Sequence, residues 1–121
     1  AKLFIPGTRS IGIGVCDDPF EKISLRLMQE TAALLDCEVS AGEEDIHIHY
    51  QIGPGYAQSS PEGREAVYRL ARSEGILVDP VYTGKALAGL FTLMEQGYFD
   101  GMENILFLHT GGAGALFAVD L

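Results

Sequence analysis

The stretch IGIGVCDDPF, residues 11–20, joins a short apolar run directly to the start of a helix. The β-branched run 11–16 predicts a buried strand. Asp18 and Pro19 are typical of a helix start, with the aspartate at the N-cap and the proline at the first helical position. Apolar residues then recur at helical spacing, which predicts a helix over roughly 19–36. The stretch therefore has the form of one strand–helix unit of an α/β fold.

The same alternation of strand and helix continues along the rest of the chain. Strands are predicted at 46–50 and 104–109, the second being the clearest buried strand, and a strand or turn at 76–79. Helices are predicted from Ser60-Pro61 to Gly75 and from Thr83, as a cap, to Gly97, with one last turn at 115–118. We therefore expect one α/β, Rossmann-like domain over residues 1–121, with three layers and a mostly parallel sheet.

The charge balance excludes two classes of partner. The 121 residues carry 17 acidic and 8 basic side chains, a net charge of −9. So acidic a chain repels nucleic acid and anionic membranes, and we expect neither as a partner. No apolar run reaches the ~18 residues that a membrane-spanning helix needs. The two cysteines, Cys16 and Cys37, are too few for a disulfide scaffold, which favours reduced thiols and a cytoplasmic location.

Glycine is unusually frequent, at 15 of 121 residues, which indicates tight turns or close approach of the backbone to a ligand. Two nucleotide-binding motifs are nevertheless absent. Gly12 and Gly14 do not continue into a dinucleotide fingerprint, because Asp17 stands where the third glycine belongs. Gly84-Lys85 is followed by alanine rather than serine or threonine, so this pair does not end a phosphate-binding loop of the Walker type.

His47 and His49 lie on one face of the predicted strand 46–50. Two imidazoles so placed can share a metal ion, with one of the acidic residues 43–45 as a carboxylate ligand. The pattern is common by chance, and no third ligand has a fixed spacing. We therefore expect a half-exposed strand face beside an acidic loop, and no metal site.

Two loops follow predicted strands, and ligands of α/β folds bind beyond the carboxyl ends of strands. The first loop, Gly53-Pro54-Gly55-Tyr56, follows the strand 46–50. Tyr56 either offers its phenol to a substrate or covers the core as part of a turn. The second loop, His109-Thr110-Gly111-Gly112-Ala113-Gly114, follows the strand 104–109. Its glycines either admit a flat ligand or a phosphate, or form a tight turn.

A third loop, residues 79–85, leads from an apolar stretch into a predicted helix. Tyr82 and Thr83 stand at the N-terminus of this helix, where backbone N–H groups and the helix dipole favour anions. Lys85 adds an ammonium group close by. The alternative is simple capping by Thr83, with Lys85 in solvent.

The residues around these loops resemble a known family. The stretches 74–86 and 105–113, together with Ala115-Leu116-Phe117, resemble the carboxyl-terminal part of the D-cysteine desulfhydrase and 1-aminocyclopropane-1-carboxylate (ACC) deaminase family. Gly53-Pro54-Gly55-Tyr56 is similar to the upstream active-site loop of that family. These enzymes use pyridoxal 5′-phosphate (PLP) and have the tryptophan-synthase-β-like fold, fold type II. The resemblance implies a partial domain, roughly the last third of such an enzyme and part of its large domain.

The resemblance also implies roles for particular residues. Tyr82 and Tyr56 match the two tyrosines that face the substrate, which makes them the catalytic candidates. Thr110 matches the hydroxyl residue beside the pyridine nitrogen of the cofactor. Thr83 stands where the deaminases carry a glutamate, a difference typical of the desulfhydrase branch. The residues expected to bind the cofactor are Thr110, Thr83, Gly111 and Gly112.

The implied reaction is β-elimination on D-cysteine or a related small amino acid, which yields pyruvate, ammonia and sulfide. The alternatives are an L-cysteate sulfo-lyase, an ACC deaminase and a non-catalytic fragment. The Schiff-base lysine of the family has no counterpart here, because none of Lys2, Lys22 and Lys85 stands in its motif. We therefore expect the isolated chain to be inactive. We also expect it either to form a homo-oligomer or to pair with a complementary chain that carries the rest of the fold.

Overall fold

The computed structural model describes residues 5–38 and 41–118, and the chain divides into two compact units. The first unit comprises Ala1–Gly14 and Asp18–His49, and the second comprises Val15–Asp17 and Tyr50–Leu121. Each unit is described by itself. The prediction of one partial domain over residues 1–121 stays a prediction.

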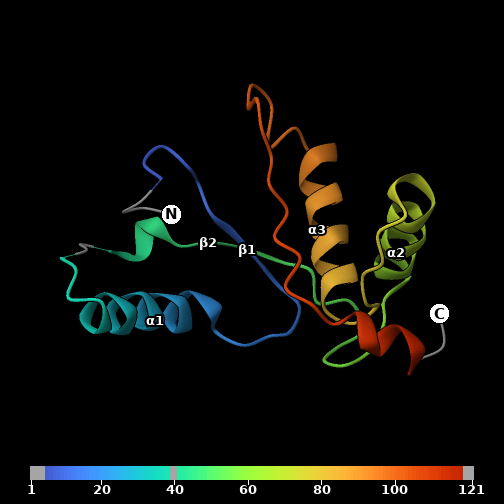
Figure 1. The fold of residues 1–121 in the computed structure, drawn as a ribbon, viewed down its shortest axis with the longest axis horizontal. Helices are drawn as coiled ribbons and strands as arrows, with labels where there is room; N and C mark the ends of the chain where they lie inside the picture. Colours follow the sequence, from blue (N-terminus) through green and yellow to red (C-terminus); the bar gives the residue numbers. More distant parts are fainter. Residues whose placement is uncertain (1–4, 39–40, 119–121) are drawn as a thin grey trace. The chain divides into compact units, whose positions relative to one another are not determined.

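The first unit holds a two-stranded parallel sheet and one helix (Figure 1). Strand β1 (Ile11–Gly14) pairs with strand β2 (His47–Tyr50), and helix α1 (Phe20–Leu34) connects them in sequence. Gly12 leaves room for Ile48 where the strands pack, because a Cβ atom there would lie 2.7 Å from Cδ1 of Ile48 and that side chain would have to shift. The α/β class and the parallel sheet are therefore as predicted.

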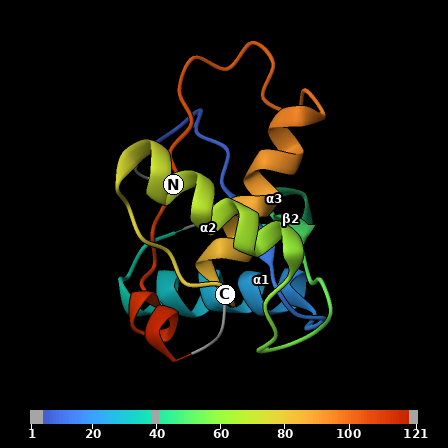
Figure 2. The same ribbon diagram turned by 90° about the vertical axis from the view of Figure 1, so that its right-hand side faces the viewer.

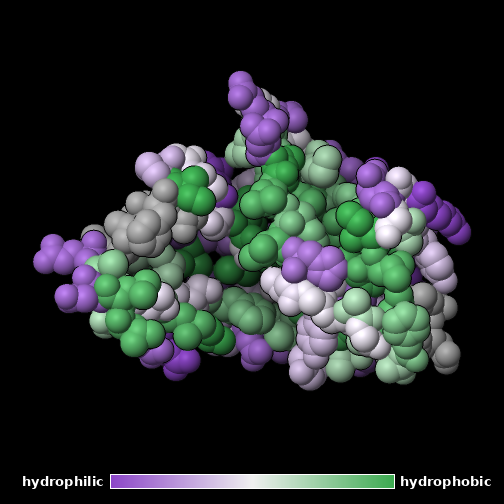
Figure 3. Space-filling view, in the orientation of Figure 1, coloured by the Kyte–Doolittle hydropathy of each residue, from purple (hydrophilic) through white to green (hydrophobic). Residues whose placement is uncertain are grey.

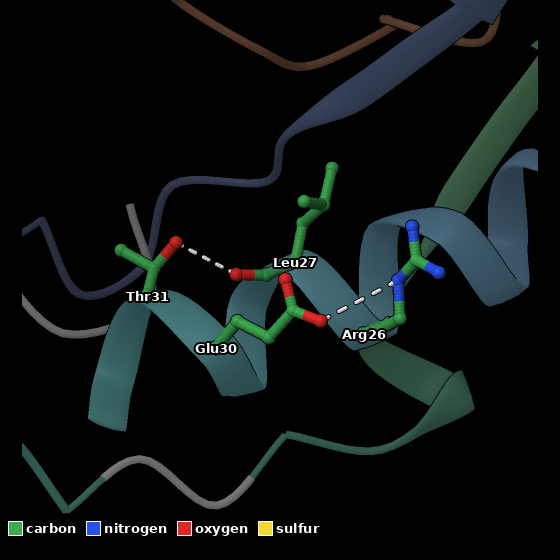
Figure 4. Close-up of polar contacts among 4 residues, drawn as sticks. All are labelled: Arg26, Leu27, Glu30 and Thr31. Atoms are coloured by element: carbon green, nitrogen blue, oxygen red, sulfur yellow. Dashed lines mark hydrogen bonds and ion pairs between the residues drawn. The ribbon is translucent and has the colours of Figure 1, made fainter. Parts of the chain in front are cut away.

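Helix α1 is shorter than predicted at both ends. Its N-cap is Pro19 rather than Asp18, because Pro19 has a non-helical ψ of 70° and the N–H of Phe20 donates to the Asp18 carbonyl. Figure 4 shows two contacts along this helix, a Thr31 hydroxyl that donates to the Leu27 carbonyl at 2.7 Å and an Arg26–Glu30 ion pair at 3.6 Å. Both side chains of the ion pair are largely exposed, so it contributes little to stability.

The second unit is built on helices α2 (Pro61–Glu74) and α3 (Thr83–Glu95), which pack against each other (Figures 1 and 2). Helix α2 begins and ends as predicted: the Ser60 hydroxyl accepts from the N–H of Gly63 at 3.0 Å, and Gly75 ends the helix at φ 68°. Apolar side chains fill the space between the helices. The core consists of Ala66, Val67, Val78, Leu87 and Ala88, with Leu70, Leu90, Phe91, Phe107 and Leu116 at its margin.

Two short 3₁₀ helices complete the described structure, η1 (Glu43–Asp45) in the first unit and η2 (Ala113–Phe117) in the second. The second matches the last turn predicted for 115–118. In the described parts of the chain, no helix is both long enough and apolar enough to cross a membrane.

The prediction of a buried strand over 104–109 is wrong. This segment and 76–79 form no strand, and Leu106 is 91% exposed. A strand exists only when a neighbour pairs with its backbone, and no described segment pairs with this one. Figure 3 shows apolar residues at the surface of the face that it displays, and Leu34 and Phe117 are also largely exposed.

The N-terminus of α3 is held by Asp79 and not, as predicted, by Thr83. Thr83 is the first residue of the helix, and the N-cap Tyr82 makes no side-chain cap. The Asp79 carboxylate accepts from the N–H groups of Val81, Tyr82 and Thr83 at 2.8, 2.7 and 2.8 Å, and from the Thr83 hydroxyl at 2.6 Å. The Thr83 hydroxyl also accepts from the N–H of Asp79 at 3.0 Å, which closes the turn.

Asp79 is fully buried, yet it is stabilised as an anion. Burial alone raises the pKa of a carboxyl group, because it penalises the charged form. Here the hydrogen bonds from the Thr83 hydroxyl and from the three N–H groups outweigh burial and lower the pKa of Asp79 below its ordinary value. A negative charge at this place is also favoured by the dipole of α3.

Gly84 sets how closely α2 and α3 approach. A Cβ atom there would lie 2.5 Å from the Asp79 carbonyl oxygen and 2.9 Å from Cγ2 of Val67. We expect Gly84→Ala to lower the free energy of unfolding by about 1–3 kcal/mol, because the helices must move apart. Gly114→Ala is the control, since nothing lies within 4 Å of its Cβ position. Thermal unfolding measures both, and equal melting temperatures would contradict this account of the helix contact.

We expect Asp79→Asn to lower the free energy of unfolding at pH 7 by about 1.5–3 kcal/mol, because charge-assisted hydrogen bonds are lost. The folded-state pKa of Asp79 lies below the unfolded value of about 3.9, so its contribution is present above that pH and is lost as the pH falls through the folded pKa. Urea unfolding between pH 7 and pH 3 should therefore show a smaller acid loss in Asp79→Asn than in the unsubstituted protein. Asp36→Asn, at an exposed site, should behave like the unsubstituted protein.

Candidate functional site

Tyr56 and Tyr82 meet at the surface of the second unit. Tyr56 lies in the loop after β2, and Tyr82 is the N-cap of α3. The Tyr82 hydroxyl donates to the Tyr56 hydroxyl at 3.2 Å, and the rings lie edge to face with centroids 6.3 Å apart. The side chains are 65% and 42% exposed, respectively, so both phenols are open to a ligand.

The hydrogen bond to Tyr56 is the largest cause of a raised pKa at Tyr82, with smaller contributions from burial and nearby negative charge. Tyr82 therefore keeps its proton at neutral pH. Because a hydroxyl both donates and accepts, the pair can deliver one proton and receive another. Two phenols in hydrogen-bonding contact are suited to acid–base work on a small polar molecule.

His109 ties the glycine-rich loop to the segment before α3. Its Nε2 lies 2.9 Å from the Leu77 carbonyl oxygen, and its Nδ1 accepts from the N–H of Gly111 at 3.1 Å. Since Nδ1 accepts, Nε2 carries the proton and donates to Leu77. The ring is therefore neutral in this arrangement, and it joins two segments that lie 32 residues apart in the sequence.

The glycines of this loop allow it to lie against Asp79. Gly111 and Gly112 have φ angles of +111° and +89°, in the region that favours glycine. A Cβ atom on Gly112 would lie 2.5 Å from Oδ1 of Asp79, so no other residue fits there without a shift. The Thr83 hydroxyl also reaches the Gly111 carbonyl at 3.4 Å, although its contact with Asp79 is shorter.

The structure thus brings five of the six predicted site residues together around one carboxylate. Tyr82, Thr83 and Gly112 lie against Asp79, Gly111 contacts Thr83, and Tyr56 joins through Tyr82. The sixth, Thr110, is exposed between His109 and Gly111. Thr83 is buried and its hydroxyl is engaged by Asp79, whereas Thr110 presents its hydroxyl at the surface. The roles of these residues toward substrate and cofactor stay predictions.

Lys85 is not in solvent, as one interpretation of the sequence placed it, because its side chain is fully buried. Its ammonium donates to the carbonyl oxygens of Ile52 and Gly55, each at 2.8 Å. Burial lowers the pKa of Lys85 below its ordinary value. A ligand at the surface therefore cannot use this amine.

Two features of the site were missed in the sequence. Asp79 was given no role, although an aspartate four residues before the first helical residue Thr83 is close enough to cap the helix. Lys85 stands alone as a charged residue in an otherwise uncharged run from Thr83 to Met94. That isolation was a signal of burial among apolar neighbours.

The remaining candidates form no site in the described residues. Within residues 5–38 and 41–118, no group of three histidine, cysteine, aspartate or glutamate side chains is arranged to hold a metal ion. Nε2 of His49 is buried without a hydrogen-bond partner. Cys16 and Cys37 form no disulfide.

Comparison with known proteins gives a family match and a similar solved structure. Residues 6–111 match the family described as pyridoxal-phosphate dependent enzyme. A solved structure described as an ACC deaminase homologue is 32% identical, with a TM-score of 0.70 over 84% of this chain. The chain spans only 30% of that protein's length. The Rossmann-like α/β fold expected from the sequence is consistent with this match. The chain belongs to the family of pyridoxal-phosphate dependent enzymes.

Proposed function

We propose that the protein carrying this chain is a PLP-dependent lyase that catalyses β-elimination on D-cysteine or a closely related amino acid. The products from D-cysteine are pyruvate, ammonia and sulfide. The observation that carries the proposal is the exposed phenol pair of Tyr56 and Tyr82, with its oxygens 3.2 Å apart. The N–H of Tyr82 donates to the Asp79 carboxylate, and the glycine-rich loop that carries Thr110 lies against the same carboxylate. Family membership and the similarity to an ACC deaminase homologue support it.

The residues around the phenol pair and the glycine-rich loop fit one side of the cofactor. Thr110 offers an exposed hydroxyl, and Gly111 leaves open space where a side chain would stand, since nothing lies within 4 Å of its Cβ position. A flat ring can therefore approach the backbone of the loop, with Thr110 beside its nitrogen. When bound, PLP supplies an electron sink for negative charge that develops on the substrate.

The lysine that holds the cofactor lies, in this proposal, outside the 121 residues. Lys85 is buried and bound to two carbonyl groups, so its amine is not free to hold a cofactor beside the phenols and the glycine-rich loop. The chain therefore contributes the acid–base and hydroxyl groups of the site, and the rest of the enzyme contributes the amine and the phosphate-binding loop.

Threonine at two positions favours elimination over deamination of ACC. Thr83 stands where the resemblance places a glutamate in the deaminases, and Asp79 holds the Thr83 hydroxyl by a 2.6 Å hydrogen bond. Thr110 is a hydroxyl as well. A hydroxyl stabilises a charged pyridine nitrogen less than a carboxylate does, which favours direct loss of a β-substituent. An L-cysteate sulfo-lyase would differ in the leaving group and in the configuration of the substrate, and an ACC deaminase is the alternative suggested by the solved relative.

Substrate comparison tests the proposal. The whole protein, supplied with PLP, is assayed for sulfide and pyruvate from D-cysteine, for sulfite from L-cysteate and for 2-oxobutyrate from ACC. We expect D-cysteine to give the highest kcat/KM, and the isolated residues 1–121 to give no turnover with any of the three. Turnover of ACC without sulfide release would support the deaminase instead, and no turnover of the three by the whole protein would support a non-catalytic role.

We expect Tyr82→Phe to lower kcat by about 10²–10⁴-fold with KM nearly unchanged, because the ring stays and only the proton-transferring oxygen is removed. Steady-state pyruvate release measures this. Tyr68→Phe is the matched control, since its phenol is similarly exposed, at 38%, but lies on α2 away from the pair. A rise in KM alone would make Tyr82 a binding residue and contradict the acid–base role.

A further inference from the structure

Lys85 is a buried ammonium that the proposed chemistry does not use. It is fully inaccessible, in the first turn of α3, three residues after Tyr82. Burying a charge is costly unless hydrogen bonds compensate for the lost water. In the described part of the chain, both hydrogen bonds of this ammonium end on main-chain carbonyl oxygens, those of Ile52 and Gly55. Because burial of this charge costs free energy, we expect Lys85 to have a role beyond the packing of α3.

The two carbonyl groups bracket a tight turn. Gly53 and Gly55 have φ angles of +65° and +141°, and Pro54 stands between them. A turn of this shape directs carbonyl oxygens inward, where they need a donor that the turn itself lacks. The Lys85 ammonium is that donor, and it replaces the backbone partners that a strand or helix would provide.

The path of the Lys85 side chain is built by glycines. Its Cγ lies 3.4 Å from the position that a Cβ atom would take on Gly63, in the first turn of α2. Its Cε lies 3.8 Å from the corresponding position on Gly53. A Cβ atom at either position would lie in ordinary van der Waals contact with the lysine side chain. The side chain thus lies between α2 and the turn, and its amine reaches the carbonyl oxygens of Ile52 and Gly55.

Tyr56 follows Gly55 directly, so the Lys85–Gly55 hydrogen bond fixes the backbone from which the Tyr56 phenol projects. Tyr56 is 65% exposed, so packing alone holds it weakly. Its hydroxyl nevertheless lies 3.2 Å from that of Tyr82. The position of the second phenol must therefore come from its backbone.

We propose that Lys85 is a positioning residue that holds Tyr56 against Tyr82 by binding the carbonyl groups of Ile52 and Gly55. One turn of α3 then supplies both a phenol of the site, from Tyr82, and the group that places the other phenol. This positioning is independent of the proposed function. Only its effect on turnover rests on that function.

Titration of the Tyr82 phenol, followed by NMR on protein with ¹³Cζ-labelled tyrosine, tests the positioning directly. The hydrogen bond to Tyr56 is the main cause of the raised pKa of Tyr82, so loss of that contact lowers the pKa toward the ordinary value of about 10. We expect Lys85→Met to lower the pKa of Tyr82 by as much as Tyr56→Phe does. Lys22→Met, at an exposed lysine of α1, should leave it unchanged.

Two results would overturn the proposal. The first is a folded Lys85→Met protein in which the pKa of Tyr82 is unchanged, since Tyr56 would then hold its place without the lysine. The second is loss of the helical circular dichroism signal in both Lys85→Met and the milder Lys85→Gln. The lysine would then maintain the whole fold rather than one loop.

Turnover gives a second readout, which separates this inference from the proposed lyase activity. Misplacement of a site group by about 1 Å can cost about 10²-fold in rate, so Lys85→Met should lower kcat/KM by that order. In a Tyr56→Phe background the same substitution should cost less than about twofold, because both changes act through one phenol. Equal losses in the two backgrounds would contradict action through Tyr56. If the unsubstituted protein turns over none of the substrates, the lyase proposal fails and the Tyr82 titration still decides the role of Lys85.

Discussion

The Asp79 carboxylate is the contact on which the second unit depends. It is buried, and it survives there as an anion only because four donors point at it, three from the backbone at the start of α3 and one from Thr83. One of its oxygen atoms, Oδ1, would lie 2.5 Å from a Cβ atom on Gly112. One charged group therefore sets where a helix begins, how Tyr82 is presented and how closely a glycine-rich loop approaches. Steric and electrostatic demands coincide at this point, since only glycine backbone fits beside so crowded an anion.

The parts of the fold that could be predicted are those that depend on residues close together in the sequence. Ser60 and Gly75 mark the two ends of α2, because a capping hydroxyl and a residue of left-handed conformation each act within one helical turn. The glycine-rich loop was recognised for the same reason. The parts that failed depend on residues distant in the sequence. Segment 104–109 has the composition of a strand but no paired neighbour among the described residues, and composition does not supply one.

The candidate site shows the same division. Tyr82 and Tyr56 were identified through the motifs around them, and the structure adds that their oxygens lie within hydrogen-bonding distance. Lys85 was misjudged because its environment is made by a turn 30 residues earlier, and a lysine is exposed far more often than it is buried. Thr83 was taken for the helix cap, yet the carboxylate four residues before it competes better for the same N–H groups.

Both ring nitrogens of His109 make hydrogen bonds that hold the fold together. One ring nitrogen donates to Leu77 and the other accepts from Gly111, which leaves no lone pair and no proton for a substrate. A histidine next to a candidate active site is ordinarily the first choice for a general base. Such a role would require His109 to give up its hydrogen bond with Gly111, in the loop that carries Thr110. In the described part of this chain, His109 therefore serves as a structural link, and the exposed phenols of Tyr56 and Tyr82 stay available to a ligand.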